Sequence, residues 1–169
     1  LWLFYGISAG ESSKLVFEKR DFSGTSDNKL TFSHAYAQYV AENDALKISI
    51  STDCGATWTQ VWSKSGATLA TVPAQTVNFF PNANQWVDNT VDLSAYDNAP
   101  DVMIAFEGTS NYGNNLFIDD INTSVSNPAA INNFTSKLSI YPNPVKDVLT
   151  IEGNYTSVDI YDVFGKLVL

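Results

Sequence analysis

The chain has 169 residues, of which 44% are hydrophobic, 13% aromatic and only 16% charged, with a formal net charge of −9 at pH 7. It is long enough to bury a core and too aromatic for intrinsic disorder. Its nine lysines and arginines form no cluster, which argues against nucleic-acid binding and against an anionic membrane surface. No run approaches 18 apolar residues, so we expect no transmembrane segment.

The single cysteine, Cys54, rules out an internal disulfide, so the core must carry the fold. The chain starts at Leu1 in an aromatic run and shows no signal peptide. We therefore expect a fragment whose targeting sequence was removed or lies upstream.

Short apolar or alternating runs, separated by Gly, Asn, Asp and Pro, recur along the first 125 residues. In the run after Ala45, the side chains of Leu46, Ile48 and Ile50 share one face, which is typical of a half-buried antiparallel strand. Several such strands without intervening helices predict an all-β fold, an antiparallel β-sandwich of the jelly-roll type. The predicted strands cover residues 14–19, 30–40, 45–52, 57–64, 85–93, 102–108 and 115–123.

Residues 126–137 are polar, contain a proline and show no strand pattern, so we predict a linker between a module over 1–125 and a second unit over 138–169. Strand-like runs resume in the second unit, which is too short for independent stability. We therefore expect either an incomplete β-sandwich or a unit that packs on the first module. Its predicted strands cover residues 138–141, 148–152, 158–161 and 166–169.

His34, the only histidine, alternates with apolar residues on one strand face. We expect it to be hydrogen-bonded in or beside the core, because a zinc site needs more His or Cys ligands than this chain holds. A single histidine, with no nucleophile-elbow sequence, also argues against hydrolysis by this chain.

Residues 51–58 fit the Asp-box pattern Ser-x-Asp-x-Gly-x-Thr-Trp, which predicts a hairpin turn. Asp53 is expected to accept hydrogen bonds from backbone amides, Gly55 to adopt positive φ, and Trp58 to pack beneath the turn. Cys54, at the turn, has no visible cation or base to activate its thiol.

Thirteen of the eighteen acidic residues are aspartates, the carboxylate favoured in turns and calcium loops. A regular strand would place Asp119 and Asp120 on opposite faces, one of them toward the buried side. Either both lie at a sheet edge and accept hydrogen bonds, or one of them binds a structural calcium. Glu107 and Asp119 also lie on predicted strands and form a formal glycosidase pair, although nothing singles them out.

Tyr112 and Asn114 are the candidate ligand-binding residues, because they lie in a polar loop whose side chains suit sugar rings and hydroxyls. Trp62, Trp86 and Tyr96 are further aromatic candidates. For aromatics on strands, the alternative is a place in the core or on a sheet face.

Spaced motifs lie in residues 30–37, 51–58, 86–94, 112–115 and 117–121. Together they resemble the choice-of-anchor J, MAM-like jelly rolls of Bacteroidetes. In related carbohydrate-binding and adhesin-type domains, the first Asp of an Ile-Asp-Asp-Ile pattern often binds structural calcium, which points to Asp119 here, with a partner ligand from a first strand. Such domains commonly follow a secreted metallopeptidase or another catalytic domain.

Residues 138–169 resemble the opening of a type IX C-terminal sorting domain. The resemblance implies export across the outer membrane of a Gram-negative bacterium, through the type IX translocon and a PorV-like shuttle protein. It also implies tail removal, followed by surface attachment or release. Because such tails are longer, we expect residues 138–169 to be the N-terminal part of this domain, without its final strands. The sorting motif comprises Tyr141, Pro142, Asn143, Pro144, Gly165 and Lys166.

We therefore expect a non-catalytic adhesion or substrate-contact module of a secreted or cell-surface protein, which binds a glycan or a protein. Two alternatives stay open. The first is an accessory domain of a secreted metallopeptidase or another hydrolase, and the second is a carbohydrate-binding module.

Overall fold

A computed structural model describes residues 1–126, 139–141, 144, 146–153, 157–162 and 164–168. The chain divides into two compact units, Leu1–Pro128 and Ala129–Leu169. The predicted linker 126–137 lies, apart from Ser126 at the end of a strand, outside the described residues.

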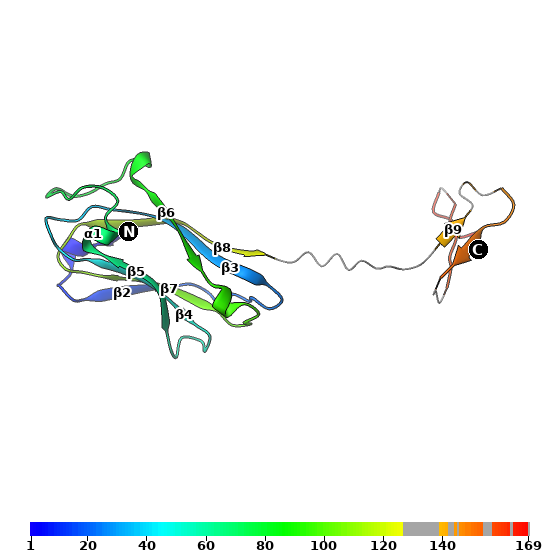
Figure 1. The fold of residues 1–169 in the computed structure, drawn as a ribbon, viewed down its shortest axis with the longest axis horizontal. Coiled ribbons are helices and arrows are strands. Elements are labelled where there is room, and N and C mark those ends of the chain that lie inside the picture. Colours follow the sequence, from blue (N-terminus) through cyan, green and yellow to red (C-terminus); the bar gives the residue numbers. More distant parts are fainter. Residues whose placement is uncertain (127–138, 142–143, 145, 154–156, 163, 169) are drawn as a thin grey trace. The chain divides into compact units, whose positions relative to one another are not determined.

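The first unit is a β-sandwich of two four-stranded antiparallel sheets, as the alternating runs predict (Figure 1). One sheet has the strand order β1-β8-β3-β6 and the other has the order β2-β7-β4-β5. These interleaved orders are those of a jelly roll, in which most connections cross from one sheet to the other. The strands are β1 (Trp2–Leu3), β2 (Ser12–Val16), β3 (Ser26–Tyr36), β4 (Ala45–Ser51), β5 (Thr59–Ser65), β6 (Val87–Asp92), β7 (Met103–Thr109) and β8 (Asn115–Ser126).

The helical elements of this unit are single turns between strands. Each of the seven predicted strands overlaps an observed one, whereas β1 was not predicted. The turns are η1 (Phe4–Gly6), α1 (Gly66–Leu69), η2 (Ala83–Gln85) and η3 (Ser94–Tyr96).

The core lies between the sheets and consists mainly of apolar side chains at alternate positions of β3, β4 and β7, which point inward and are buried. The aromatic rings pack edge to face, with the Phe32 centroid 5.3 Å from those of both Trp62 and Phe106. Core side chains include Leu30, Phe32 and Tyr36 of β3, Leu46, Ile48 and Ile50 of β4, Ile104 and Phe106 of β7, and Leu116 of β8.

A second, smaller apolar cluster covers part of the outer face of the β1-β8-β3-β6 sheet. Ala35 of β3 and Ala37, which directly follows β3, are fully buried beneath Phe79, with Trp86 and Phe117 packed alongside. The chain between α1 and η2 therefore closes one region of an outer face that would otherwise be exposed to solvent.

The second unit contains β9 (Ser139–Tyr141) and β10 (Thr150–Glu152), which pair antiparallel. Among the described residues of the strands predicted over 158–161 and 166–169, Tyr161 and Leu167 form an isolated antiparallel bridge. Within the described part of the chain, no helix is long and apolar enough to cross a membrane.

Candidate functional site

Tyr112 lies in the β7–β8 loop with its side chain 57% exposed. Its φ is +61°, a conformation that is uncommon for residues other than glycine. The Tyr112 N–H donates to the buried Ser110 hydroxyl, 3.2 Å away. This bond fixes the backbone on the N-terminal side of Tyr112.

A buried carboxylate, Asp44, anchors this loop. Its Oδ1 accepts hydrogen bonds from the backbone N–H groups of Asn111 (2.6 Å) and Gly113 (3.1 Å), and its Oδ2 accepts one from the Tyr36 hydroxyl (2.7 Å). Burial, then the bond to Asp44, raises the pKa of the Tyr36 phenol, which stays protonated and donates. Sequence reasoning missed Asp44, because its loop partners lie 67 and 69 positions further along the chain.

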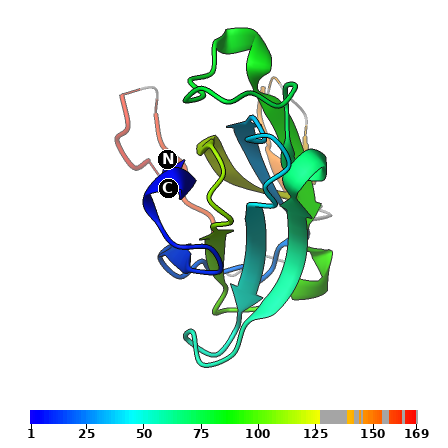
Figure 2. The ribbon, with the colours of Figure 1, turned by 90° about the vertical axis from the view of Figure 1, so that its left-hand side faces the viewer.

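Two neighbouring segments bring further exposed tyrosines to the same end of the sandwich, which Figure 2 views end-on. In the β3–β4 loop, Tyr39 is 36% exposed, and the Asn43 N–H of that loop donates to the Asn111 side chain at 2.9 Å. In η1, Tyr5 is 51% exposed, and the Ser110 hydroxyl donates to the adjoining Phe4 carbonyl at 2.9 Å. Hydrogen bonds thus join the three segments that carry these tyrosines.

Asn114, the other predicted ligand contact, is only 2% exposed. Its Oδ1 accepts from the N–H of Phe79 at 2.8 Å, and its Nδ2 donates to the carbonyl of Val77 at 2.8 Å. The side chain therefore holds the loop that covers the outer sheet face, and its role in ligand binding stays a prediction.

The remaining aromatic candidates pack against the core or against the outer face of a sheet. Trp62 lies against Phe32 in the core, Tyr96 packs against the same core, and Trp86 stacks edge-on to Phe117 with centroids 6.3 Å apart. Among the four aromatic candidates, only Tyr112 lies on an exposed loop.

Asp119 and Asp120 are both exposed, so the expectation that one points toward the buried side is wrong. The reason is a bulge in β8, where the register with β3 shifts and Asp120 adopts a φ of +50°, which breaks the alternation of faces. The Asp119 Oδ1 accepts the N–H of Asp120 at 2.9 Å. Among the described residues, no group of three or more His, Cys, Asp or Glu side chains could hold a metal. Calcium binding by Asp119 or Asp120 would need backbone or water oxygens as well, and it stays a prediction.

The Asp-box hairpin between β4 and β5 forms as predicted. The Asp53 carboxylate accepts bonds from the Ser51 hydroxyl (2.7 Å) and from the hydroxyl and N–H of Thr57 (2.6 and 2.9 Å), which lowers its pKa to about 2. Gly55 has a φ of +88°, and the Trp58 indole N–H donates to its carbonyl at 3.0 Å. Cys54 is exposed at the turn.

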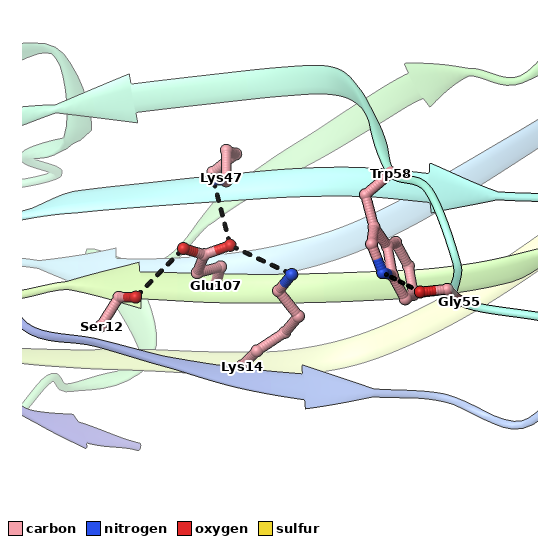
Figure 3. A network of polar contacts seen from close by, with 6 residues as sticks. All are labelled: Ser12, Lys14, Lys47, Gly55, Trp58 and Glu107. Carbon is pink, nitrogen blue, oxygen red and sulfur yellow. Dashed lines mark hydrogen bonds and ion pairs between the residues drawn. The ribbon is translucent and has the colours of Figure 1, made fainter.

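Beside the hairpin, a polar network crosses the outer face of the β2-β7-β4-β5 sheet (Figure 3). Glu107 pairs with Lys47 at 3.0 Å and with Lys14 at 3.5 Å, and the Lys14 Nζ lies 5.0 Å from the centre of the Trp58 ring. Burial alone would raise the Glu107 pKa, but bonds from Lys47 and Ser12 outweigh it and lower the pKa. Glu107 and Asp119 belong to different sheets, so the fold does not bring this carboxylate pair together.

His34 is buried and hydrogen-bonded, as predicted. Its Nε2 lies 2.9 Å from the Leu69 carbonyl, which only accepts, so Nε2 carries the proton and Nδ1 accepts from the Asn89 amide at 2.7 Å. Burial lowers the imidazole pKa and favours the neutral form. A neutral ring with both nitrogens engaged serves the fold.

The described sorting-motif residues of the second unit lie at its surface, whereas Pro142 and Asn143 lie outside the described residues. Tyr141 is 43% exposed and pairs with Thr150. Gly165 has a φ of +81° in a turn that Asp162 closes by accepting the N–H of Lys166 at 2.9 Å. Pro144, Gly165 and Lys166 are exposed.

A comparison with protein families finds a match in the second unit. Residues 139–169 match the model of the secretion system C-terminal sorting domain. No curated protein matches the chain. The match supports export by type IX secretion, and it indicates that the chain is part of a secreted or cell-surface protein.

Proposed function

We propose that the β-sandwich is a non-catalytic contact module of this exported protein and binds glycans outside the cell through Tyr5, Tyr39 and Tyr112. The carrying observation is that three exposed tyrosines lie on three segments joined by hydrogen bonds at one end of the sandwich. Tyrosine rings offer flat apolar faces for sugar rings, and their hydroxyls reach sugar oxygens.

The anchoring of these loops supports the proposal. Tyr112 and the β-branched Val40 both have positive φ and are more than half exposed, conformations that cost about 1–3 kcal/mol each and persist only when the surroundings impose them. For the loop that carries Tyr112, hydrogen bonds to Asp44 and Ser110 supply that constraint. Because the loop is already ordered, the binding free energy is not reduced by the entropy cost of ordering it.

The strand order of the sandwich is consistent with the choice-of-anchor J resemblance, which we keep as a proposal. We also propose that the sorting domain engages the type IX translocon and a PorV-like shuttle protein. The protein, expressed in a type IX host with and without residues 139–169, should reach the surface or medium only with them. Equal export of both forms would refute the role of this tail.

Calcium binding by Asp119 or Asp120 stays a prediction. If calcium is bound there, further oxygen ligands must complete its shell. A chelator should then lower the melting temperature of the wild type but not of Asp119→Ala. Identical melting curves with and without chelator would rule the site out.

A glycan array tests the contact surface. The wild-type chain should bind a subset of glycans, and Tyr112→Ala should weaken those signals. Tyr161→Ala is the matched control, because Tyr161 is 59% exposed, close to the 57% of Tyr112, but lies in the second unit. The proposal fails if no glycan is bound or if both variants bind like the wild type.

A further inference from the structure

The outer face of the β8-β3-β6 strands carries a polar groove of about 310 Å³, away from the tyrosine-bearing loops. Strand register explains its composition. Thr31 of β3 lies between Asn122 of β8 and Thr90 of β6, and the next outward residue of β3, Ser33, pairs with Asp88. The groove is lined by Thr31, Ser33, Asp88, Thr90, Asp120 and Asn122, together with Phe32 and Asn89.

The bulge in β8 shapes one side of this groove. The Asp119 carboxylate accepts a hydrogen bond from the N–H of Asp120, and Asp120 has positive φ. At this bulge, the side chain that lines the groove is that of Asp120. On β6, the Ser33 hydroxyl donates to Asp88 at 2.6 Å, which fixes the orientation of that carboxylate.

Aromatic side chains lie one step further along the same sheet face. Ala35, two residues after Ser33, pairs with Phe117, and the Phe117 ring packs against Trp86, with 6.3 Å between centroids. Both rings are partly exposed. The polar groove therefore lies next to partly exposed aromatic rings. Proteins bind sugar rings with this combination of polar side chains and aromatic faces.

The negative charge of the groove favours neutral ligands over anionic ones. Its lining holds two carboxylates, three hydroxyl groups and the amides of asparagine, but no lysine or arginine. Carboxylates accept hydrogen bonds from sugar hydroxyls, whereas they repel sulfate, phosphate and uronate groups. The volume lies at the lower end of the roughly 300–1,000 Å³ typical of ligand sites.

We propose that this groove is a second binding site, which takes a neutral carbohydrate chain. It deepens the proposed glycan contact by adding a separate site with a stated preference, and it does not depend on Tyr112. The hydroxyls of Thr31 and Thr90 contact the sugar at the floor of the groove. Asp88 and Asp120 accept from sugar hydroxyls at its two sides.

Affinity electrophoresis in native gels tests this site, since the chain, with its net charge of −9, migrates toward the anode. Gels containing mannan, xylan or hydroxyethyl cellulose should retard the wild type in at least one case, and a gel containing alginate should not. The double variant Thr31→Val/Thr90→Val keeps the β-branched shape and removes both hydroxyls. It should bind the retarding polymer about tenfold more weakly.

Two further variants separate the possible results. Thr59→Val is the matched control, because Thr59 is exposed on β5 of the other sheet, and it should migrate like the wild type. Asp120→Asn tolerates positive φ and removes one charge, and it should weaken retardation by the neutral polymer. Unchanged melting curves confirm that the variants are folded.

Several results would refute the proposal that the groove binds carbohydrate. They are no retardation in any neutral gel, retardation by alginate as strong as by the neutral polymers, or full retardation of Thr31→Val/Thr90→Val. Tyr112→Ala, run in the same gels, distinguishes the two sites. Loss of retardation in Tyr112→Ala alone would favour the tyrosine loops and refute the groove. Loss of retardation in Thr31→Val/Thr90→Val alone would show that the groove binds the polymer and that the tyrosine loops are not needed.

Discussion

Removing the Asp44 carboxylate should be among the most damaging substitutions in the sandwich. Asp44 is fully buried, and Asp44→Ala leaves three donors without their partner: the Tyr36 hydroxyl and the N–H groups of Asn111 and Gly113. An unsatisfied buried donor costs about 1–3 kcal/mol, and water entering the vacated space recovers part of that cost. We expect a total loss of about 3–5 kcal/mol, a large fraction of the roughly 5–15 kcal/mol that holds a domain folded.

Two milder variants should lose less of the free energy of unfolding than Asp44→Ala. Asp44→Asn keeps an oxygen for the two backbone donors, and the Tyr36 hydroxyl can turn to accept from the new amide, so we expect a loss of about 1–2 kcal/mol. Tyr36→Phe removes one donor and leaves the carboxylate with its two backbone partners, at an expected cost of about 1 kcal/mol.

Urea unfolding followed by tryptophan fluorescence measures these losses, because all four tryptophans lie in the first unit. With a slope of about 2 kcal/mol per molar urea, Asp44→Ala should lower the midpoint by about 1.5–2.5 M. A shift below about 0.5 M, or an Asp44→Asn midpoint as low as that of Asp44→Ala, would refute the anchoring role.

Three further predictions concern the sandwich. Burial lowers the pKa of His34 from its usual 6.5, so stability should fall as pH drops through that value, and His34→Gln should flatten this dependence in pH-dependent melting. The pKa of Asp53 is lowered from 3.8 to about 2, so its contribution is present above 3.8 and is lost as pH falls through 2. Asp53→Asn should therefore melt with less acid sensitivity than the wild type. Gly113→Ala should lower the melting temperature, because its Cβ would overlap the Asp44 carboxylate, and unaltered melting would contradict that packing.

Alternating side chains predict the sandwich well, because burial of one strand face leaves a period of two in the sequence. The run with Leu46, Ile48 and Ile50 became β4, with all three side chains buried. In contrast, β1 spans only Trp2–Leu3, and two residues carry no periodicity.

The candidate site was less predictable, because its geometry depends on contacts between distant segments. Tyr112 was found from loop composition, but Asp44 appears in the sequence as one more loop acid. The bulge at Asp120 follows from a local positive φ in a strand-like run, which alternation does not reveal. Asn114 has a composition suited to ligands, yet its buried amide holds the chain near Phe79.

Titration calorimetry with the glycan that gives the strongest array signal tests the contact role most directly. We predict that the wild type binds it, that Tyr112→Ala binds about tenfold more weakly because a stacking face is lost, and that Tyr161→Ala matches the wild type. Equal dissociation constants for the wild type and Tyr112→Ala would contradict the proposal that the tyrosine-bearing loops form the contact surface.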